Sequence, residues 1–235
     1  MMKKVLLILC LMVLLVSCTQ YSGGPTKMPA ETTSGDSSTP PQVIESVQQS
    51  SPEVQDLLEK SIGLTNYKYL FDASETDSYE LWRKDGLLKK VYSDPVKLGK
   101  EDFYNEVYLD MDTKTAIGIC TEAGVLCGPV WKVSFTLNYD YELPSPDPVE
   151  LVEAIGYAER TGTERVESRS TTIVNLPEEK QRFWLDDYYG FPLKYVRYEL
   201  RGDVEQVLEK HTFSKVQVNQ VKTSDVTMPT GYTPK

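Results

Sequence analysis

The sequence predicts a mainly antiparallel β domain with two or more helices, an α+β fold. About ten short runs of alternating apolar and polar residues follow one another from residue 67 onwards. Two segments carry helix-capping residues: one precedes the first of these runs, and the other separates the sixth run from the seventh. Runs joined by short turns pair as antiparallel hairpins, so we expect a meandering sheet with the helices over one face.

The first helix is expected over residues 52–62. Ser51 is a suitable N-cap, Pro52 suits the first helical position, and Gly63 should end the helix. A helical period places one set of apolar residues on the buried side. This set comprises Val54, Leu57, Leu58 and Ile62.

A second helix is expected over residues 149–160. Asp147 is the predicted N-cap, Pro148 takes the first position, and Gly162 should end this helix. Val152, Ile155 and Ala158 define its apolar side.

The strands are predicted from period-two alternation and from turn signals such as Asp85-Gly86. The clearest one covers residues 131–139, where apolar and polar side chains alternate without a break. Residues 223–234 are expected to be an extended tail on the sheet. The predicted strands are 67–71, 79–83, 87–92, 103–109, 115–120, 131–139, 164–176, 181–186, 193–200, 207–213 and 216–221.

The first 17 residues are typical of a signal peptide. Lys3 and Lys4 precede an apolar run, Val5 to Val16, that is too short to span a bilayer. The run ends in Leu-Val-Ser-Cys18, which resembles a lipobox, the signal for lipidation of the cysteine and cleavage before it. An ordinary secretory signal with an incidental Cys18 is the alternative. A two-chain lipid on Cys18 would attach the protein stably to the outer face of a membrane.

The predicted domain organisation follows from composition. Residues 1–17 form the signal peptide, 18–50 a lipidated cysteine and a disordered tether rich in Ser, Thr and Pro, and 51–235 the folded domain. Residues 18–235 carry 23 basic and 35 acidic side chains. That balance disfavours nucleic acid and anionic membrane surfaces as partners, so contact with the membrane is expected through the anchor.

Cysteine parity supports the anchor. If Cys18 is acylated, Cys120 and Cys127 remain as a pair in a compartment where disulfides form. We therefore predict a Cys120–Cys127 disulfide, with two reduced and buried thiols as the alternative. A metal site is not expected, because the chain has a single histidine to add to these thiols.

We predict no catalytic residues and no cofactor. The sequence lacks a nucleophile elbow around serine and a glycine-rich phosphate loop. His211 is interpreted as a structural or surface histidine, although a hydrolase dependent on it stays open. The carboxylate pairs Asp186-Asp187 and Asp110/Asp112 stand beside predicted turns, where aspartate is expected in any case.

Several stretches resemble the LolA/LolB/LppX superfamily of lipid and lipoprotein carriers. The family's characteristic turn is similar to Phe-Trp-Leu-Asp-Asp at 183–187 followed by Gly-Phe-Pro-Leu at 190–193. The family's early hairpin is similar to Leu-Trp-Arg-Lys at 81–84, and its closing segment to Asp-Val-Thr-Met-Pro-Thr-Gly-Tyr at 225–232. The resemblance implies an open half-barrel whose concave face is covered by helices, with acyl chains bound between them.

On this interpretation the protein binds a lipid or acyl chain as a local carrier or acceptor. The alternative is a surface sensor or protein-interaction module, with another envelope protein as partner and the concavity packed shut. The expected ligand-binding residues are apolar and lie on strands of the concave face. They are Val107, Leu109, Trp131, Val133, Phe135, Leu137, Phe183 and Leu185.

Overall fold

The computed structural model describes residues 49–72, 78–121 and 132–235. They belong to one compact unit, Ser46–Lys235. The expected signal peptide, Cys18, the tether up to residue 48, Cys127 and Trp131 lie outside the described residues. In the part that is described, no helix is long and apolar enough to cross a membrane.

One sheet of 12 strands organises the domain. All neighbouring pairs are antiparallel except β12 and β6, and the sheet stays open, with β12 at one edge and β7 at the other. The predicted α+β fold with an open antiparallel sheet is therefore confirmed. The strands are β1 (Asn66–Asp72), β2 (Tyr79–Lys84), β3 (Leu87–Lys97), β4 (Phe103–Asp110), β5 (Thr115–Ile119), β6 (Val133–Leu137), β7 (Glu159–Val166), β8 (Arg169–Leu176), β9 (Gln181–Asp186), β10 (Pro192–Arg201), β11 (Val204–Val218) and β12 (Thr233–Pro234).

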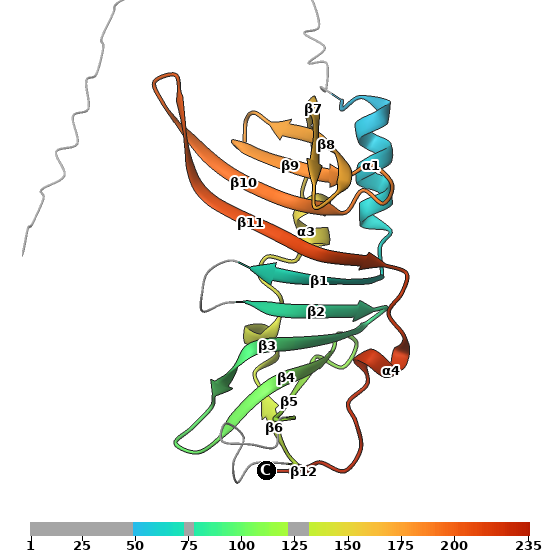
Figure 1. Ribbon diagram of the computed structural model, residues 1–235, viewed down its shortest axis with the longest axis vertical. Helices are drawn as coiled ribbons and strands as arrows, with labels where there is room; N and C mark the ends of the chain where they lie inside the picture. Colours follow the sequence, from blue (N-terminus) through green and yellow to red (C-terminus); the bar gives the residue numbers. More distant parts are fainter. Residues whose placement is uncertain (1–48, 73–77, 122–131) are drawn as a thin grey trace, which may run out of the picture. The chain divides into compact units, whose positions relative to one another are not determined.

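The sheet consists of two meanders joined side by side. Strands β1 to β6 follow one another in space, as do β7 to β11, and β1 pairs with β11 where the two meanders meet (Figure 1). Because β6 and β7 lie at opposite ends of the strand order, the chain between them has to cross the sheet. This connection carries α2 (Tyr139–Glu142) and α3 (Pro148–Glu153).

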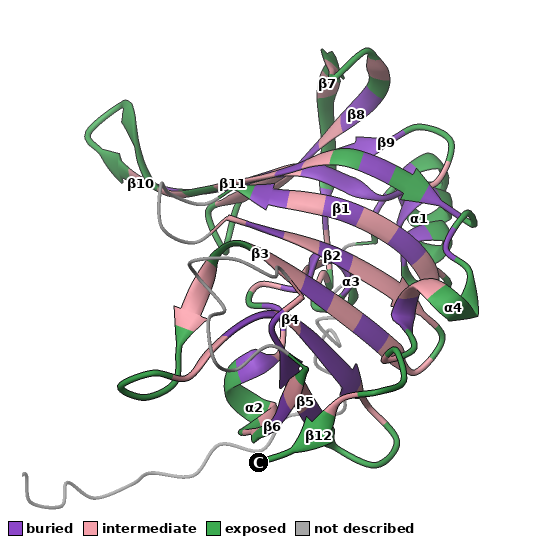
Figure 2. Ribbon diagram, turned by 60° about the horizontal axis from the view of Figure 1, so that its bottom comes forward, coloured by how far each residue is buried: buried purple, intermediate pink, exposed green. Residues whose placement is uncertain are grey.

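Helices cover one face of the sheet, which we call the inner face. Helix α1 (Pro52–Ile62) and α3 pack on β8, β9 and β10 in one apolar cluster that includes Val54, Val152 and Phe183. A second cluster joins Val149 of α3 to the side chains of β1, β2 and β4. Along these strands buried and more exposed residues alternate (Figure 2), as expected for a sheet covered on one side.

Local sequence explains where the helices begin. Ser51 caps α1 by accepting a hydrogen bond from the Val54 amide at 3.4 Å, and Pro52 takes the first turn, as predicted. Asp147 caps α3 in the same way, followed by Pro148. The predicted buried face of α1 is correct except at its end, because Ile62 is 47% exposed and Ser61 is buried instead.

The predicted helix over 149–160 is too long. Helix α3 ends at Glu153, and residues 159–166 form strand β7 instead, so that Gly162 lies within a strand. The predicted single strand 164–176 is likewise wrong, because the chain reverses at Glu167 and Ser168 to form the β7–β8 hairpin. Both turn residues have positive φ angles, 48° and 68°, without the Asn-Gly pair that announces such turns.

Three further predictions differ from the structure. Residues 207–213 and 216–221 were expected to be separate strands, but β11 extends as one strand from Val204 to Val218, with a shift of register against β1 near Lys215, whose φ is 52°. The strand predicted over 131–139 is described only as β6, and Tyr139 begins α2. The expected extended tail contains a short helix, α4 (Thr223–Val226), before β12 pairs in parallel with β6.

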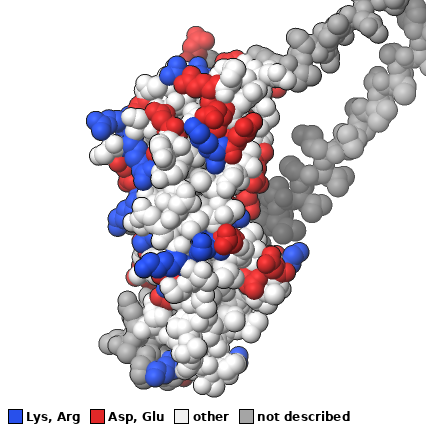
Figure 3. Space-filling model, turned by 90° about the vertical axis from the view of Figure 1, so that its right-hand side faces the viewer, with Lys and Arg blue, Asp and Glu red and all other residues white. Residues whose placement is uncertain are grey.

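The opposite, outer face carries ladders of charged and aromatic side chains. The ammonium of Lys68 lies 3.9 Å from the ring centroid of Trp82 and 3.0 Å from a carboxylate oxygen of Glu80. Lys89 pairs with Glu106 at 3.0 Å on the same face. On the side of the domain shown in Figure 3, acidic and basic side chains are likewise interspersed.

Candidate functional site

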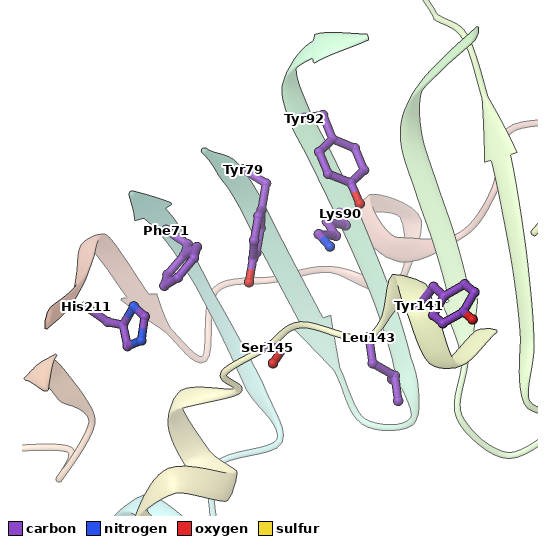
Figure 4. Close-up of a pocket in the computed structure, with 8 residues that line it drawn as sticks. All are labelled: Phe71, Tyr79, Lys90, Tyr92, Tyr141, Leu143, Ser145 and His211. Atoms are coloured by element: carbon purple, nitrogen blue, oxygen red, sulfur yellow. The ribbon is translucent and has the colours of Figure 1, made fainter. Parts of the chain in front are cut away.

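A pocket of about 420 Å³ opens on the inner face, between β1, β2, β3 and β11 and the α2–α3 connection. Aromatic and aliphatic side chains make up most of its wall, with a few polar groups among them. The lining residues are Phe71, Tyr79, Lys90, Tyr92, Tyr141, Leu143, Ser145 and His211 (Figure 4).

The aromatic wall comes from one row of the sheet. Phe71 on β1 stands directly opposite Tyr79 on β2, and Tyr79 stands opposite Tyr92 on β3. The ring centroids are 5.0 Å apart in the first pair and 6.3 Å in the second. Directly opposed residues of an antiparallel sheet point to the same side, so the register itself builds this wall.

Lys90 places a positive charge within the wall. The β3 residues Leu88, Lys90 and Tyr92 alternate onto the inner face, and Lys90 is only 6% exposed. Its ammonium lies 4.4 Å from the ring centroid of Tyr79 and 4.8 Å from that of Tyr92. Both distances are within the range of cation–π attraction, which orients the ammonium between the two rings.

The α2–α3 connection is tied to the sheet by the buried carboxylate of Glu142. This group accepts hydrogen bonds from the hydroxyls of Tyr92 at 2.8 Å and Tyr104 at 2.7 Å. Burial, reinforced by the bond to Glu142, raises the pKa of both tyrosines, so both remain proton donors at neutral pH. The contact fixes α2, and with it Tyr141 and Leu143, at the side of the pocket.

His211 forms the far end of the wall. Its ring lies parallel to that of Tyr195, with centroids 5.7 Å apart, and 5.3 Å from the ring of Phe71. Nε2 lies 2.6 Å from a carboxylate oxygen of Glu209, within hydrogen-bond distance, whereas Nδ1 is buried without a hydrogen-bond partner among the described residues. His211 thus lines the pocket, and its interpretation as a structural histidine stays a prediction.

The residues expected to bind the ligand lie on the inner face but outside this pocket. Val107 and Leu109 are buried in the cluster beneath β1–β4, and Phe183 and Leu185 are buried beneath α1 and α3. Val133, Phe135 and Leu137 pack with Cys120 in a small cluster at the β6 end of the sheet. Trp131 lies outside the described residues, as does Cys127, so the predicted disulfide stays a prediction.

One signal in the sequence could have pointed to the pocket. Lys90 stands at an inward position of its strand, between Leu88 and Tyr92, where a core strand would carry an apolar residue. Tyr141, Leu143 and Ser145 could not have been identified in this way, because they lie in a connection whose path depends on the strand order.

The carboxylate pairs are used for turns. Asp186 accepts hydrogen bonds from the amides of Tyr188 and Tyr189 at 3.0 and 2.8 Å, and from Arg169 at 3.0 Å. Asp110 accepts from the amides of Asp112 and Thr113. Within residues 49–72, 78–121 and 132–235, no group of three or more potential ligands could hold a metal ion.

Comparisons with known proteins add two similar structures. LprF from Mycobacterium bovis is similar with a TM-score of 0.43 and 12% identity, over 77% of this chain and 98% of LprF. A DUF1329 family protein from Desulfovibrio piger is similar with a TM-score of 0.22 and 9% identity, over 75% of this chain and 98% of that protein. No family model matches the sequence, and no curated protein is similar to it. The architecture implied by the LolA/LolB/LppX resemblance is confirmed by the open, helix-covered sheet itself.

Proposed function

We propose that this chain is a non-enzymatic lipoprotein, anchored outside the cytoplasm through Cys18, that binds a lipid or acyl chain as a local carrier or acceptor. The observation that carries the proposal is the aromatic pocket on the inner face of the sheet. Its volume of about 420 Å³ falls within the range of small-molecule sites, which are concave and mostly apolar. Burial of an acyl chain there would drive binding at about 25 cal/mol per Å² before the costs of association.

The anchor determines how such a domain would work. The predicted tether, residues 18–50, would give the domain a root-mean-square reach on the order of 30 Å. A domain on this leash samples its own membrane surface and does not diffuse away with its ligand. This favours an acceptor or local carrier over a soluble shuttle.

The anchor is tested by fractionation of cells. The variant Cys18→Ser should move from the membrane fraction to the soluble fraction and lose metabolic labelling with palmitate. Cys10→Ser, which changes the other cysteine of the signal, is the matched control and should behave like the natural chain. Retention of the Cys18 variant on the membrane would contradict the lipobox.

The pocket is tested with residues 18–235 carrying Cys18→Ser, which keeps the protein in solution. Lipids that co-purify are identified by mass spectrometry, and affinity is measured by titration with a fluorescent fatty acid. Tyr141→Ala should weaken binding several-fold, because Tyr141 lines the pocket and is 84% exposed, so its truncation leaves the core intact. Tyr188→Ala, at a tyrosine that is 76% exposed and does not line the pocket, is the control and should bind normally.

Protein that purifies empty and fails to bind the fluorescent fatty acid would overturn the proposal. Equal loss of binding in the Tyr141 and Tyr188 variants would show that the pocket is not the site.

A sensor or interaction module is the second candidate, and one observation favours it. Near the turn of the long β10–β11 hairpin, four large apolar side chains are more than half exposed. They are Leu200, Val204, Val207 and Leu208. This candidate predicts a stoichiometric protein partner from the membrane fraction that Tyr141→Ala retains and Val207→Lys loses.

A further inference from the structure

The polar groups of the pocket indicate the chemistry of the ligand's headgroup. We propose that the pocket takes a single-chain amphiphile with a carboxylate headgroup, held by the ammonium of Lys90 and the hydroxyl of Tyr79. This inference rests on the proposed function and makes it more specific. Neither side chain was expected from the sequence to be part of a site.

The first argument is the position of the positive charge. Lys90 is nearly buried, yet it lines the pocket, and the rings of Tyr79 and Tyr92 hold its ammonium in place. In a site of low polarity such a charge interacts with an anion more strongly than it would in water. An ammonium offers three donors and no acceptor, so it favours carboxylate oxygens over ester or hydroxyl groups.

The second argument is an unused donor beside it. Tyr79 is 5% exposed, and its buried hydroxyl makes no hydrogen bond of standard geometry among the described residues, with the hydroxyl of Tyr69 and the backbone of Ser145 beside it. Burial raises the pKa of Tyr79, so the phenol keeps its proton at neutral pH. A buried hydroxyl without a partner is unfavourable, and a ligand oxygen would satisfy it.

The arrangement of the two groups suits one headgroup between apolar walls. In Figure 4, Lys90 and Tyr79 both point toward the α2–α3 connection near Ser145, with Phe71 on one side and Tyr92 and Leu143 on the other. The volume of about 420 Å³ lies in the lower half of the range for small-molecule pockets, which favours a single chain.

Two other charged or titratable groups near the pocket do not compete for the headgroup. The ring of His211 is held at the far end of the wall, where Nε2 contacts Glu209 and the ring stacks on Tyr195. The carboxylate of Glu142 is already bound by Tyr92 and Tyr104.

The experiment compares two competitors that differ only in the headgroup. Residues 18–235 with Cys18→Ser are loaded with a fluorescent fatty acid, and dodecanoic acid or methyl dodecanoate is titrated to displace it. We expect the acid to bind at least tenfold more tightly than the ester, as for a charge-assisted hydrogen bond. Lys90→Met should remove this preference and leave the affinity for the ester unchanged.

Matched controls separate the headgroup from general effects. Lys89→Met removes the neighbouring charge on the outer face, where Lys89 pairs with Glu106, and should retain the preference for the acid. Tyr79→Phe removes only the hydroxyl and should weaken binding of the acid about fivefold or more, while Tm is measured alongside to confirm that the variant is folded. This variant decides the question if Lys90→Met does not fold.

The outcomes distinguish this inference from the proposed function. Equal affinity for acid and ester would overturn the carboxylate headgroup and leave lipid binding in place. An acid preference that survives in folded Lys90→Met, or that is not reduced in Tyr79→Phe, would also overturn it. If neither the competitors nor the fluorescent probe bind, both the proposed function and this inference are overturned.

Discussion

Asp147 accepts a hydrogen bond from the hydroxyl of Tyr67, which lies 80 residues earlier in the chain, at 3.2 Å. The same carboxylate caps α3 by accepting from the amide of Val149 at 2.8 Å, and Arg83 lies 3.7 Å away. Asp147 therefore fastens the connection that borders the pocket to strands β1 and β2.

The first prediction concerns this buried carboxylate. Asp147→Ala should lower the free energy of unfolding by about 3–5 kcal/mol, because Arg83 would lose its carboxylate partner and α3 its cap. Tyr67→Phe removes the hydrogen bond to Asp147 and the one accepted from Arg83, and should cost about 1–3 kcal/mol. Urea unfolding followed by circular dichroism measures both values, and a loss below about 1 kcal/mol in Asp147→Ala would contradict the fastening role.

The second prediction compares two glycines with positive φ angles, Gly190 at 70° and Gly202 at 64°. A Cβ at residue 190 would clash with the backbone carbonyl oxygen of Leu57 in α1, whereas at residue 202 it would meet nothing within 4 Å. Gly202→Ala should therefore cost only backbone strain, about 1–2 kcal/mol. Gly190→Ala should cost clearly more, as measured by Tm, since α1 must also move. Equal losses would mean that α1 does not press on this turn.

The sequence predicts the elements of this fold better than its connections. Ser51-Pro52 and Asp147-Pro148 are local signals, and both helices begin where these signals place them. The end of α3 and the reversal at Glu167-Ser168 depend on the pairing of β7 with β8, a contact that has no Gly or Asn signal at the turn. Alternation along their strands places Val107 and Phe183 on the inner face. Alternation shows on which face of the sheet a side chain lies, but it does not show which part of that face is left open as a pocket.

The third prediction follows from that turn. Ser168 has a φ angle of 68°, a conformation that a side chain disfavours and glycine accepts. Ser168→Gly should raise the free energy of unfolding by about 0.5–1 kcal/mol. Glu167→Asn is the informative comparison: it also suits the turn, but it removes the acceptor of the Lys215 amide bond and should gain less. If Ser168→Gly lowers the free energy of unfolding instead, backbone strain at this turn does not limit the stability of the β7–β8 hairpin.

The last prediction is a dependence of stability on pH. Partial burial would by itself raise the pKa of Glu209, but the hydrogen bonds and charges of His211 and Arg197 outweigh it and lower the pKa below the ordinary value of 4.5. The folded state therefore keeps this carboxylate ionised to lower pH than the unfolded state does. Its contribution to stability is complete above the unfolded pKa and is lost as pH falls through the folded pKa.

Glu209→Gln should accordingly reduce the free energy of unfolding at neutral pH, by less than about 1 kcal/mol because the pair is partly exposed and screened by solvent. The difference from the natural chain should disappear once the pH falls below the folded pKa of Glu209, where this carboxyl group is uncharged. Urea titrations across this range measure it. Glu178→Gln, at an exposed carboxylate in the β8–β9 turn, is the control and should show no such trend. A difference that persists unchanged at low pH would mean that Glu209 stabilises the hairpin by packing and not by its charge.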